Sequence, residues 1–129
     1  MKKLISIIAS LLLVTSCSSN PSGVTNMNVS EFSKKITESG VVILDVRTPG
    51  EFAEGFIEGA QNIDFQSENF ENEIAALDKK ATYAIYCRSG NRSGQAAKIM
   101  HDAGFHDVYN LDGGVIDWAN EGMTLVQNQ

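Results

Sequence analysis

Two uninterrupted apolar runs most restrict the folds open to this chain. Residues 41–44 and 83–86 contain no charged or amide side chain, so neither run alternates like a strand with one solvated face. Such runs are typical of parallel strands that are covered on both sides. A third strand is expected at 108–111, and segments with helical spacing separate the three. The sequence therefore predicts an α/β domain of three layers, with a mostly parallel central sheet flanked by helices.

Cap residues mark where the intervening helices begin. Ser30 is a favourable N-cap for the first helix. Thr48 and Glu51 form a capping box for the second, with Pro49 at the first helical position. The first helix is expected to begin at Ser30. Four further helices are expected at residues 48–53, 67–77, 94–103 and about 115–119.

The predicted sheet indicates where a functional site would lie. In open α/β sheets, ligands bind beyond the carboxyl ends of the strands. Asp45, Cys87 and Asp112 each lie at or just after such an end. Cys87 is the residue among them with nucleophilic chemistry, so this edge of the sheet is the expected active site.

Residues 87–93, Cys-Arg-Ser-Gly-Asn-Arg-Ser, form a short loop between a predicted strand and a predicted helix. Backbone N–H groups at a helix N-terminus create an anion-binding concavity, and this field favours the thiolate form of a cysteine. Arg88 and Arg92 place positive charge in the same loop. The loop therefore predicts a Cys87 nucleophile that acts on a small anion. The alternatives are a buried inert thiol and a solvated pair of surface arginines.

The overall charge argues against several classes of partner. The 129-residue chain has room for one domain, and its formal net charge is −6. This balance is unfavourable for binding nucleic acid or an acidic lipid surface. No metal site is expected, because the chain has no C-x-x-C motif and His101 and His106 lack finger spacing from a cysteine pair.

The first seventeen residues resemble an export signal. A basic start is followed by an apolar segment at 4–14 that is too short to span a bilayer. Val14-Thr15-Ser16-Cys17 resembles the lipobox of bacterial lipoproteins, in which the cysteine is lipidated and becomes the new N-terminus. We therefore expect an exported domain, lipid-anchored through Cys17 to the cell-envelope membrane and facing the periplasm in a double-membraned cell. The alternative is an ordinary signal peptide that leaves a soluble protein.

Three motifs in order resemble those of single-domain rhodaneses, which are sulfurtransferases. Residues 44–52, LDVRTPGEF, resemble the segment D-V-R-x-x-x-E-[FY], and residues 87–93 resemble the active loop C-x-x-G-x-R-S. Residues 111–118, LDGGVIDW, match L-x-G-G-x-x-x-W. One segment departs from the family pattern: Phe56 and Glu58 stand where the family has histidine and proline, so altered packing near the site is expected.

The lipobox-like segment and the rhodanese-like motifs together imply a division of the chain into four parts. These parts are a lipoprotein signal peptide at 1–16, a lipidated N-terminus and flexible tether at 17–26, a rhodanese-like domain at 27–122 and a C-terminal tail at 123–129.

The resemblance also implies a mechanism with no cofactor. The Cys87 thiolate takes the outer sulfur of thiosulfate or a similar donor, and the resulting persulfide passes that sulfur to cyanide, a thiol or a thiol protein partner. The residues expected to bind donor and persulfide are Arg88, Ser89, Gly90, Asn91, Arg92 and Ser93. The residues expected to support the site structurally are Asp45, Arg47, Glu51, Gly113 and Gly114.

Two other interpretations stay open at this point. Cysteine phosphatases and arsenate reductases also use a cysteine loop, but the phosphatase pattern is C-x₅-R and this chain has C-x₄-R, which makes a smaller ring of amides. The domain could also be a persulfide carrier or a binding module that acts with protein partners.

Overall fold

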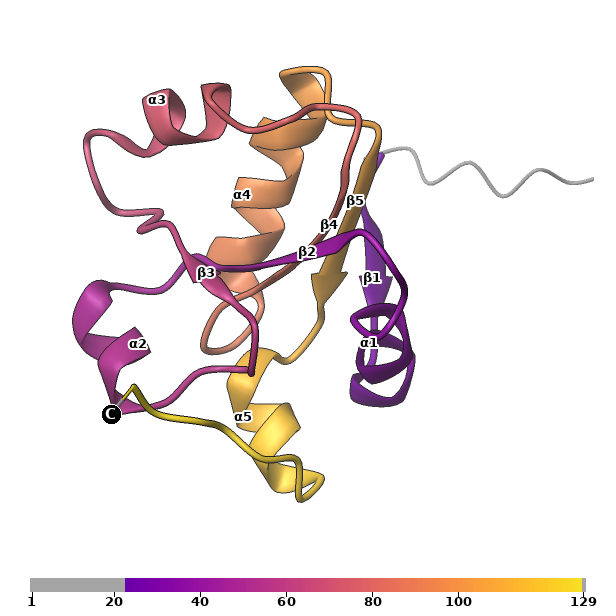
Figure 1. Ribbon diagram of the computed structural model, residues 1–129, viewed down its shortest axis with the longest axis vertical. Helices are drawn as coiled ribbons and strands as arrows, with labels where there is room; N and C mark the ends of the chain where they lie inside the picture. Colours follow the sequence, from indigo (N-terminus) through magenta and orange to yellow (C-terminus); the bar gives the residue numbers. More distant parts are fainter. Residues whose placement is uncertain (1–22, 129) are drawn as a thin grey trace, which may run out of the picture.

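The computed structural model describes residues 23–128 (Figure 1). The predicted signal peptide, Cys17 and the tether up to residue 22 lie outside the described residues. In chain order the elements are β1 (Thr25–Met27), α1 (Val29–Lys35), β2 (Val41–Asp45), α2 (Pro49–Glu54), β3 (Gln61–Asn62), α3 (Phe70–Ala75), β4 (Thr82–Tyr86), α4 (Asn91–Asp102), β5 (Asp107–Leu111) and α5 (Gly114–Asn120).

The strands form one parallel sheet in the order β1-β5-β4-β2-β3. The two apolar runs pair with each other at its centre, where Ile43 lies opposite Ala84. This position explains why neither run alternates, because both of its faces are covered. The predicted α/β class and parallel sheet are confirmed.

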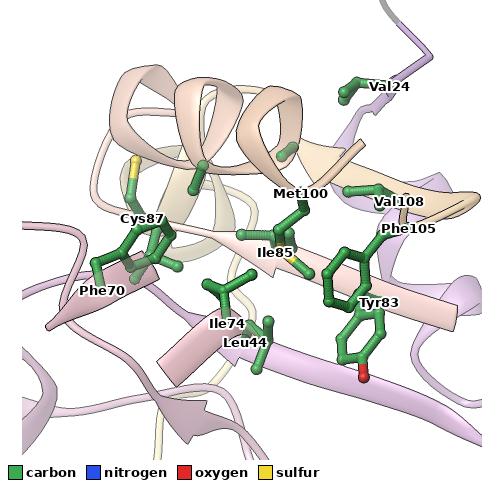
Figure 2. Close-up of a cluster of buried hydrophobic side chains, with 13 residues drawn as sticks. Val24, Leu44, Phe70, Ile74, Tyr83, Ile85, Cys87, Met100, Phe105 and Val108 are labelled. Atoms are coloured by element: carbon green, nitrogen blue, oxygen red, sulfur yellow. The ribbon is translucent and has the colours of Figure 1, made fainter. Parts of the chain in front are cut away.

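One face of the sheet is covered by α3 and α4, which pack on it through a cluster of buried hydrophobic side chains. Figure 2 shows this cluster, with the Cys87 sulfur beside α4. The strand residues on this face occupy alternate positions. The buried members of the cluster are Val24, Leu44, Val46, Phe70, Ile74, Tyr83, Ile85, Cys87, Ala96, Ala97, Met100, Phe105 and Val108.

The other face is covered by α1 and α5, which contribute Phe32 and Trp118. The Phe32 ring makes edge-to-face contacts with Tyr86 at 6.5 Å and with Trp118 at 6.3 Å between centroids. The sheet therefore lies between two helical layers (Figure 1), as the predicted three-layer arrangement requires. No helix among residues 23–128 is both long and apolar enough to cross a bilayer.

The first helix begins earlier than predicted. Its N-cap is Asn28, whose side chain accepts from the Glu31 N–H at 2.9 Å while the Glu31 carboxylate accepts from the Asn28 N–H at 3.5 Å. Ser30 lies inside the first turn and has no acidic residue three positions later, so it cannot form this reciprocal pair. The prediction of Ser30 as the cap is wrong.

Both predicted domain boundaries fall inside paired structure. Thr25 and Asn26 belong to β1, where they pair with β5, although the tether was expected to extend to residue 26. Near the other end, Val126 forms an antiparallel bridge with Phe56, although residues 123–129 were expected to be a tail. The backbone groups of both segments form hydrogen bonds with residues that are distant in the sequence. Such pairing produces no local sequence pattern from which the boundaries could be predicted.

Candidate active site

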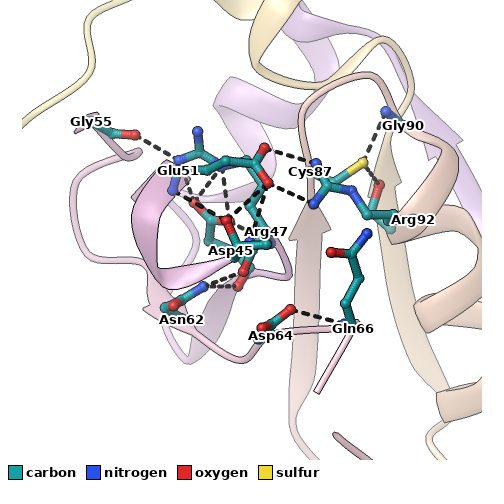
Figure 3. Close-up of polar contacts among 12 residues, drawn as sticks. Asp45, Arg47, Glu51, Gly55, Asn62, Asp64, Gln66, Cys87, Gly90 and Arg92 are labelled. Carbon is teal, nitrogen blue, oxygen red and sulfur yellow. Dashed lines mark hydrogen bonds and ion pairs between the residues drawn. The ribbon is translucent and has the colours of Figure 1, made fainter. Parts of the chain in front are cut away.

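The side chain of Cys87 lies directly after β4 and is fully buried. Its sulfur accepts from the Gly90 N–H, with 3.1 Å between N and Sγ (Figure 3). It also accepts from the Ser93 hydroxyl, with 3.3 Å between Oγ and Sγ. Gly90 caps α4 and Ser93 lies in its first turn, so the sulfur sits at the N-terminus of a 12-residue helix. Both contacts place hydrogen-bond donors where negative charge on sulfur would develop.

Opposing effects determine the pKa of the Cys87 thiol. Burial raises it, because desolvation disfavours the thiolate. Hydrogen bonds from the Ser93 hydroxyl and from the backbone N–H groups of Ser93, Ser89 and Gly90 lower it. The hydrogen bonds together outweigh burial, and the pKa lies below the usual value for cysteine.

The loop is held in shape by backbone packing against the start of α5. The Val115 N–H donates to the Cys87 carbonyl at 3.0 Å, and the Ile116 N–H donates to the Arg88 carbonyl at 3.1 Å. Gly114 makes this approach possible, because a Cβ there would lie 2.6 Å from the Cys87 carbonyl oxygen and closer still to that of Arg88. Gly114 of LDGGVIDW therefore lets α5 pack closely against the cysteine loop, and Gly113 is the N-cap of α5 with a φ of +88°.

Gly90 also requires the backbone freedom of glycine. Its φ is +97°, and a Cβ would lie 3.0 Å from the Gly113 nitrogen. The left-handed conformation turns the Gly90 N–H back toward the sulfur three residues earlier. A side chain at this position would disturb both the turn and the contact with the β5–α5 connection.

Arg92 is bound to protein rather than presented to a ligand. Its two terminal nitrogens each donate to a different oxygen of Glu51 at 2.8 Å. Glu51 is also the capping-box residue of α2, since its carboxylate accepts from the Thr48 N–H. The hydrogen bonds from Arg92 lower the pKa of Glu51 from 4.5 to about 2, although burial acts in the opposite direction. The sequence predicts that Arg92 binds the sulfur donor. In the structure its guanidinium instead connects the cysteine loop to α2 through Glu51.

Arg88 is the exposed cation of the loop, and no ion pair within residues 23–128 includes it. Ser89 and Asn91 are exposed as well, and Asn91 accepts from the Gln95 side chain at 2.6 Å. Arg88 is therefore the guanidinium that remains available to an incoming anion.

Asp45 and Arg47 form the buried base of the site. The Arg47 side chain donates to both Asp45 oxygens, at 2.6 Å for the shortest contact, and also to the Gly55 carbonyl. Asn62 donates to the carbonyl oxygens of Asp45 and Arg47, at 2.9 Å each. This network fixes the end of β2 against the segment after α2, which is the structural role expected for the two charged residues.

Sequence reasoning missed two residues that complete this base. The Tyr86 hydroxyl accepts from the Ile57 N–H at 3.0 Å, and burial raises the pKa of Tyr86 far above its usual value. The apolar run at 83–86 indicates only a strand for Tyr86, and no local motif marks Asn62. The contacts of both residues are distant in sequence, so no local motif could have revealed them.

The Rhodanese-like domain family matches residues 28–121 of the chain. The chain belongs to this family. Thiosulfate sulfurtransferase GlpE from Pseudomonas aeruginosa strain LESB58 is 39% identical over 88 residues, which cover 68% of this chain and 78% of that relative. A sulfurtransferase from Allochromatium vinosum is 37% identical over 86 residues, with coverage of 67% and 78%.

Solved structures agree with this assignment. The crystal structure of a rhodanese-like domain protein from Staphylococcus aureus matches with a TM-score of 0.69 at 30% identity, covering 81% of this chain and 99% of that chain. A rhodanese-related protein from Thermoplasma volcanium matches with a TM-score of 0.71 at 28% identity, with coverage of 81% and 99%. The resemblance drawn from the three motifs is confirmed.

In this rhodanese-like domain, Phe56 packs where the family motif has histidine. Its ring stacks on Phe52 of α2, with 4.2 Å between centroids and 12° between planes. Its backbone exchanges two hydrogen bonds with Val126, at 2.9 and 2.8 Å. Glu58 is exposed to solvent. The departure from the family pattern therefore lies in the segment that holds the C-terminal residues beside α2.

Proposed function

We propose that this rhodanese-like domain transfers a sulfane sulfur from thiosulfate, or a donor like it, to cyanide or a thiol through a Cys87 persulfide. The observation that carries the proposal is the environment of the Cys87 sulfur, which receives N–H and O–H donors at a helix N-terminus and has a lowered pKa. The thiosulfate sulfurtransferases among its relatives support the same chemistry.

The proposed reaction has two displacement steps. The Cys87 thiolate attacks the outer sulfur of thiosulfate, the S–S bond of the donor breaks, and sulfite leaves with the bonding electron pair. The acceptor, cyanide or a thiolate, then attacks the outer sulfur of the persulfide and restores the Cys87 thiolate. Because Cys87 exposes none of its surface, the side chains around the loop must shift to admit either reactant.

The contacts of Arg92 with Glu51 argue against phosphatase activity. A phosphoryl group in a cysteine loop needs the loop arginine for its oxygens. Here both terminal nitrogens of that arginine are taken by Glu51, and the loop is one residue shorter than the phosphatase pattern. The same pairing is compatible with a persulfide, whose single outer sulfur can be held by backbone N–H groups.

The test is thiocyanate formation from thiosulfate and cyanide by the purified protein. We expect turnover with the unaltered chain and with Cys17→Ser, and none with Cys87→Ala. Treatment with thiosulfate alone should add about 32 Da, one sulfur atom, to Cys17→Ser and nothing to Cys87→Ala. Hydrolysis of an aryl phosphate without thiocyanate formation would contradict the proposal.

We also propose that the protein is exported and anchored to the cell-envelope membrane by a lipid on Cys17. The lipobox-like residues 14–17 directly after the apolar segment support this. Two or three acyl chains would hold the protein stably at the membrane, since each buried CH₂ contributes about 0.8 kcal/mol.

A further inference from the structure

A cavity of about 320 Å³ opens on the face of the sheet away from the Cys87 sulfur, between α1, α5 and the residues that follow α5. Its lining includes Ile43, Ile57 and Trp118, which belong to the buried cluster under α1 and α5. Cys87 belongs to the cluster on the other face. The cavity is therefore separate from the candidate active site, and its volume is within the range of small-molecule sites.

The inner surface of the cavity is apolar. Ile43, Ile57 and Trp118 are buried, with at most 8% of their surface exposed, and they form its floor. Ile36 and Met123 are half-buried and pack against the same cluster at its sides. An apolar group that entered here would displace water from these side chains, which favours its binding in proportion to the area covered.

Two parts of the lining are particular to this chain. Glu58 stands where the family motif has proline, and Met123 and Thr124 follow the end of the family match at residue 121. The Met123 N–H donates to the Trp118 carbonyl at 3.1 Å, and the Trp118 indole donates to the Thr124 carbonyl at 3.0 Å. These bonds fix the residues after α5 as one wall, so the chemistry of the cavity depends on residues outside the family pattern.

The hydroxyl groups that α1 contributes to the lining are arranged as acceptors. The Ser33 hydroxyl donates to the Ser30 carbonyl at 2.8 Å, and the Thr37 hydroxyl donates to the Lys34 carbonyl at 2.7 Å. Each hydroxyl has one hydrogen, which is used within the helix, so its oxygen is left to accept from a ligand. Groups of this kind favour a ligand that carries hydrogen-bond donors.

Glu58 gives the rim of the cavity a negative charge. It is the one charged residue among those that line the cavity, and no ion pair within residues 23–128 includes it. Lys35 of α1 is bound to Glu38 at 3.0 Å and lies outside the lining. A cationic ligand would therefore meet a carboxylate that is not already paired, next to an apolar floor.

We propose that this cavity binds a small organic ammonium ion, with its apolar group against Ile43, Ile57 and Trp118 and its N–H donors at Glu58 and the hydroxyl oxygens of α1. An anion would be repelled by Glu58. A neutral apolar molecule would cover the floor but leave the carboxylate without a charged partner. The proposal does not depend on sulfur transfer, since the cavity and Cys87 lie on opposite faces of the sheet.

The test is a titration of the purified protein with 2-phenylethylammonium at pH 7, followed by NMR at the Trp118 indole N–H. The chain has one tryptophan, so the indole cross-peak is unique and reports on this cavity. We expect a saturable shift, with an affinity about tenfold higher than for 2-phenylethanol, because the ammonium adds charge-assisted hydrogen bonds to the same apolar contact. Glu58→Gln should reduce the affinity for the ammonium about fivefold and leave that for the alcohol unchanged.

Glu121→Gln is the matched control, since it removes an exposed carboxylate that does not line the cavity, and it should bind the ammonium as the parent does. No saturable shift, equal affinities for ammonium and alcohol, or equal losses in the two glutamine variants would overturn the proposal. A lysine side chain presented as Nα-acetyl-lysine methylamide should bind at least tenfold more weakly, because it carries no ring to cover the floor. Binding as tight as that of 2-phenylethylammonium would make a protein lysine the occupant and would overturn the assignment to a small ligand.

Discussion

At the scale of single residues, the reactivity expected of Cys87 depends on a few donors in a buried place. The Cys87 side chain is completely covered, and burial alone would keep its thiol protonated. The Ser93 hydroxyl and the N–H groups at the start of α4 reverse this and lower the pKa. The hydroxyl is the contribution that a substitution can remove without disturbing the backbone.

We therefore expect Ser93→Ala to raise the pKa of Cys87. Losing a hydrogen bond to a charged sulfur should slow alkylation by iodoacetamide about tenfold on the acidic side of its pH profile. The measurement uses the Cys17→Ser background, in which Cys87 is the remaining cysteine. Ser89→Ala is the control, since that side chain is exposed and should leave the profile in place. Identical profiles for Ser93→Ala and its parent would refute this role of the hydroxyl.

At the scale of elements, Glu51 connects α2 and α4, which are separated in the sequence by β3, α3 and β4. It completes the capping box of α2 and receives both terminal nitrogens of Arg92 in the first turn of α4. The side chains of Arg92 and Glu51 are 20% and 28% exposed, so water screens the pair only in part. This contact fixes the cysteine loop relative to α2.

We expect Glu51→Gln to lower the free energy of unfolding by about 1 kcal/mol at pH 7. The folded protein holds the pKa of Glu51 at about 2, below its usual 4.5, so the carboxylate stabilises the fold above about pH 4.5 and loses this effect as the pH falls toward 2. Denaturant unfolding at several pH values should show the variant and the parent converging in acid.

Glu38→Gln is the matched control for this measurement. Glu38 pairs with Lys35 at 3.0 Å, but its side chain is 56% exposed, so its removal should change stability little. A constant difference between Glu51→Gln and the parent from pH 7 down to pH 2 would show that the ion pair is not the source of the effect.

How far these elements could be predicted depends on where their partners lie. The apolar runs of β2 and β4 and the capping box of α2 carry their signals within a few residues, and the structure has them where predicted. The predicted cysteine loop is shorter than expected, because α4 begins at Asn91 and not at residue 94. The β1 strand, the Phe56–Val126 bridge and the Glu51–Arg92 pair depend on residues far apart in the sequence. No local spacing encodes such contacts, so the roles of Arg92 and of the C-terminal residues could not be predicted.

At the scale of the whole molecule, the parallel sheet separates the start of β1 from the candidate active site. All five strands run in the same direction (Figure 1). The chain therefore enters β1 at the amino ends of the strands, whereas Cys87 follows β4 at their carboxyl ends. From Cys17 to Val24 the chain can span at most about 25 Å. A domain of about 100 residues has a radius of gyration of about 13 Å, which makes it roughly 33 Å across.

A lipid on Cys17 would therefore keep the cysteine loop away from the bilayer. The span from the anchor is shorter than the domain, so the loop edge cannot be turned onto the membrane, and the sulfur donor and acceptor must arrive from the aqueous side. Spin labels on vesicle-bound lipidated protein, in the Cys87→Ser background, test this. We expect a nickel-chelating lipid to relax a label at Lys80→Cys, before β4, far more than one at Ala53→Cys, in α2. Stronger relaxation at residue 53 would contradict the orientation, and Cys17→Ala, which should not bind the vesicles, tests the anchor itself.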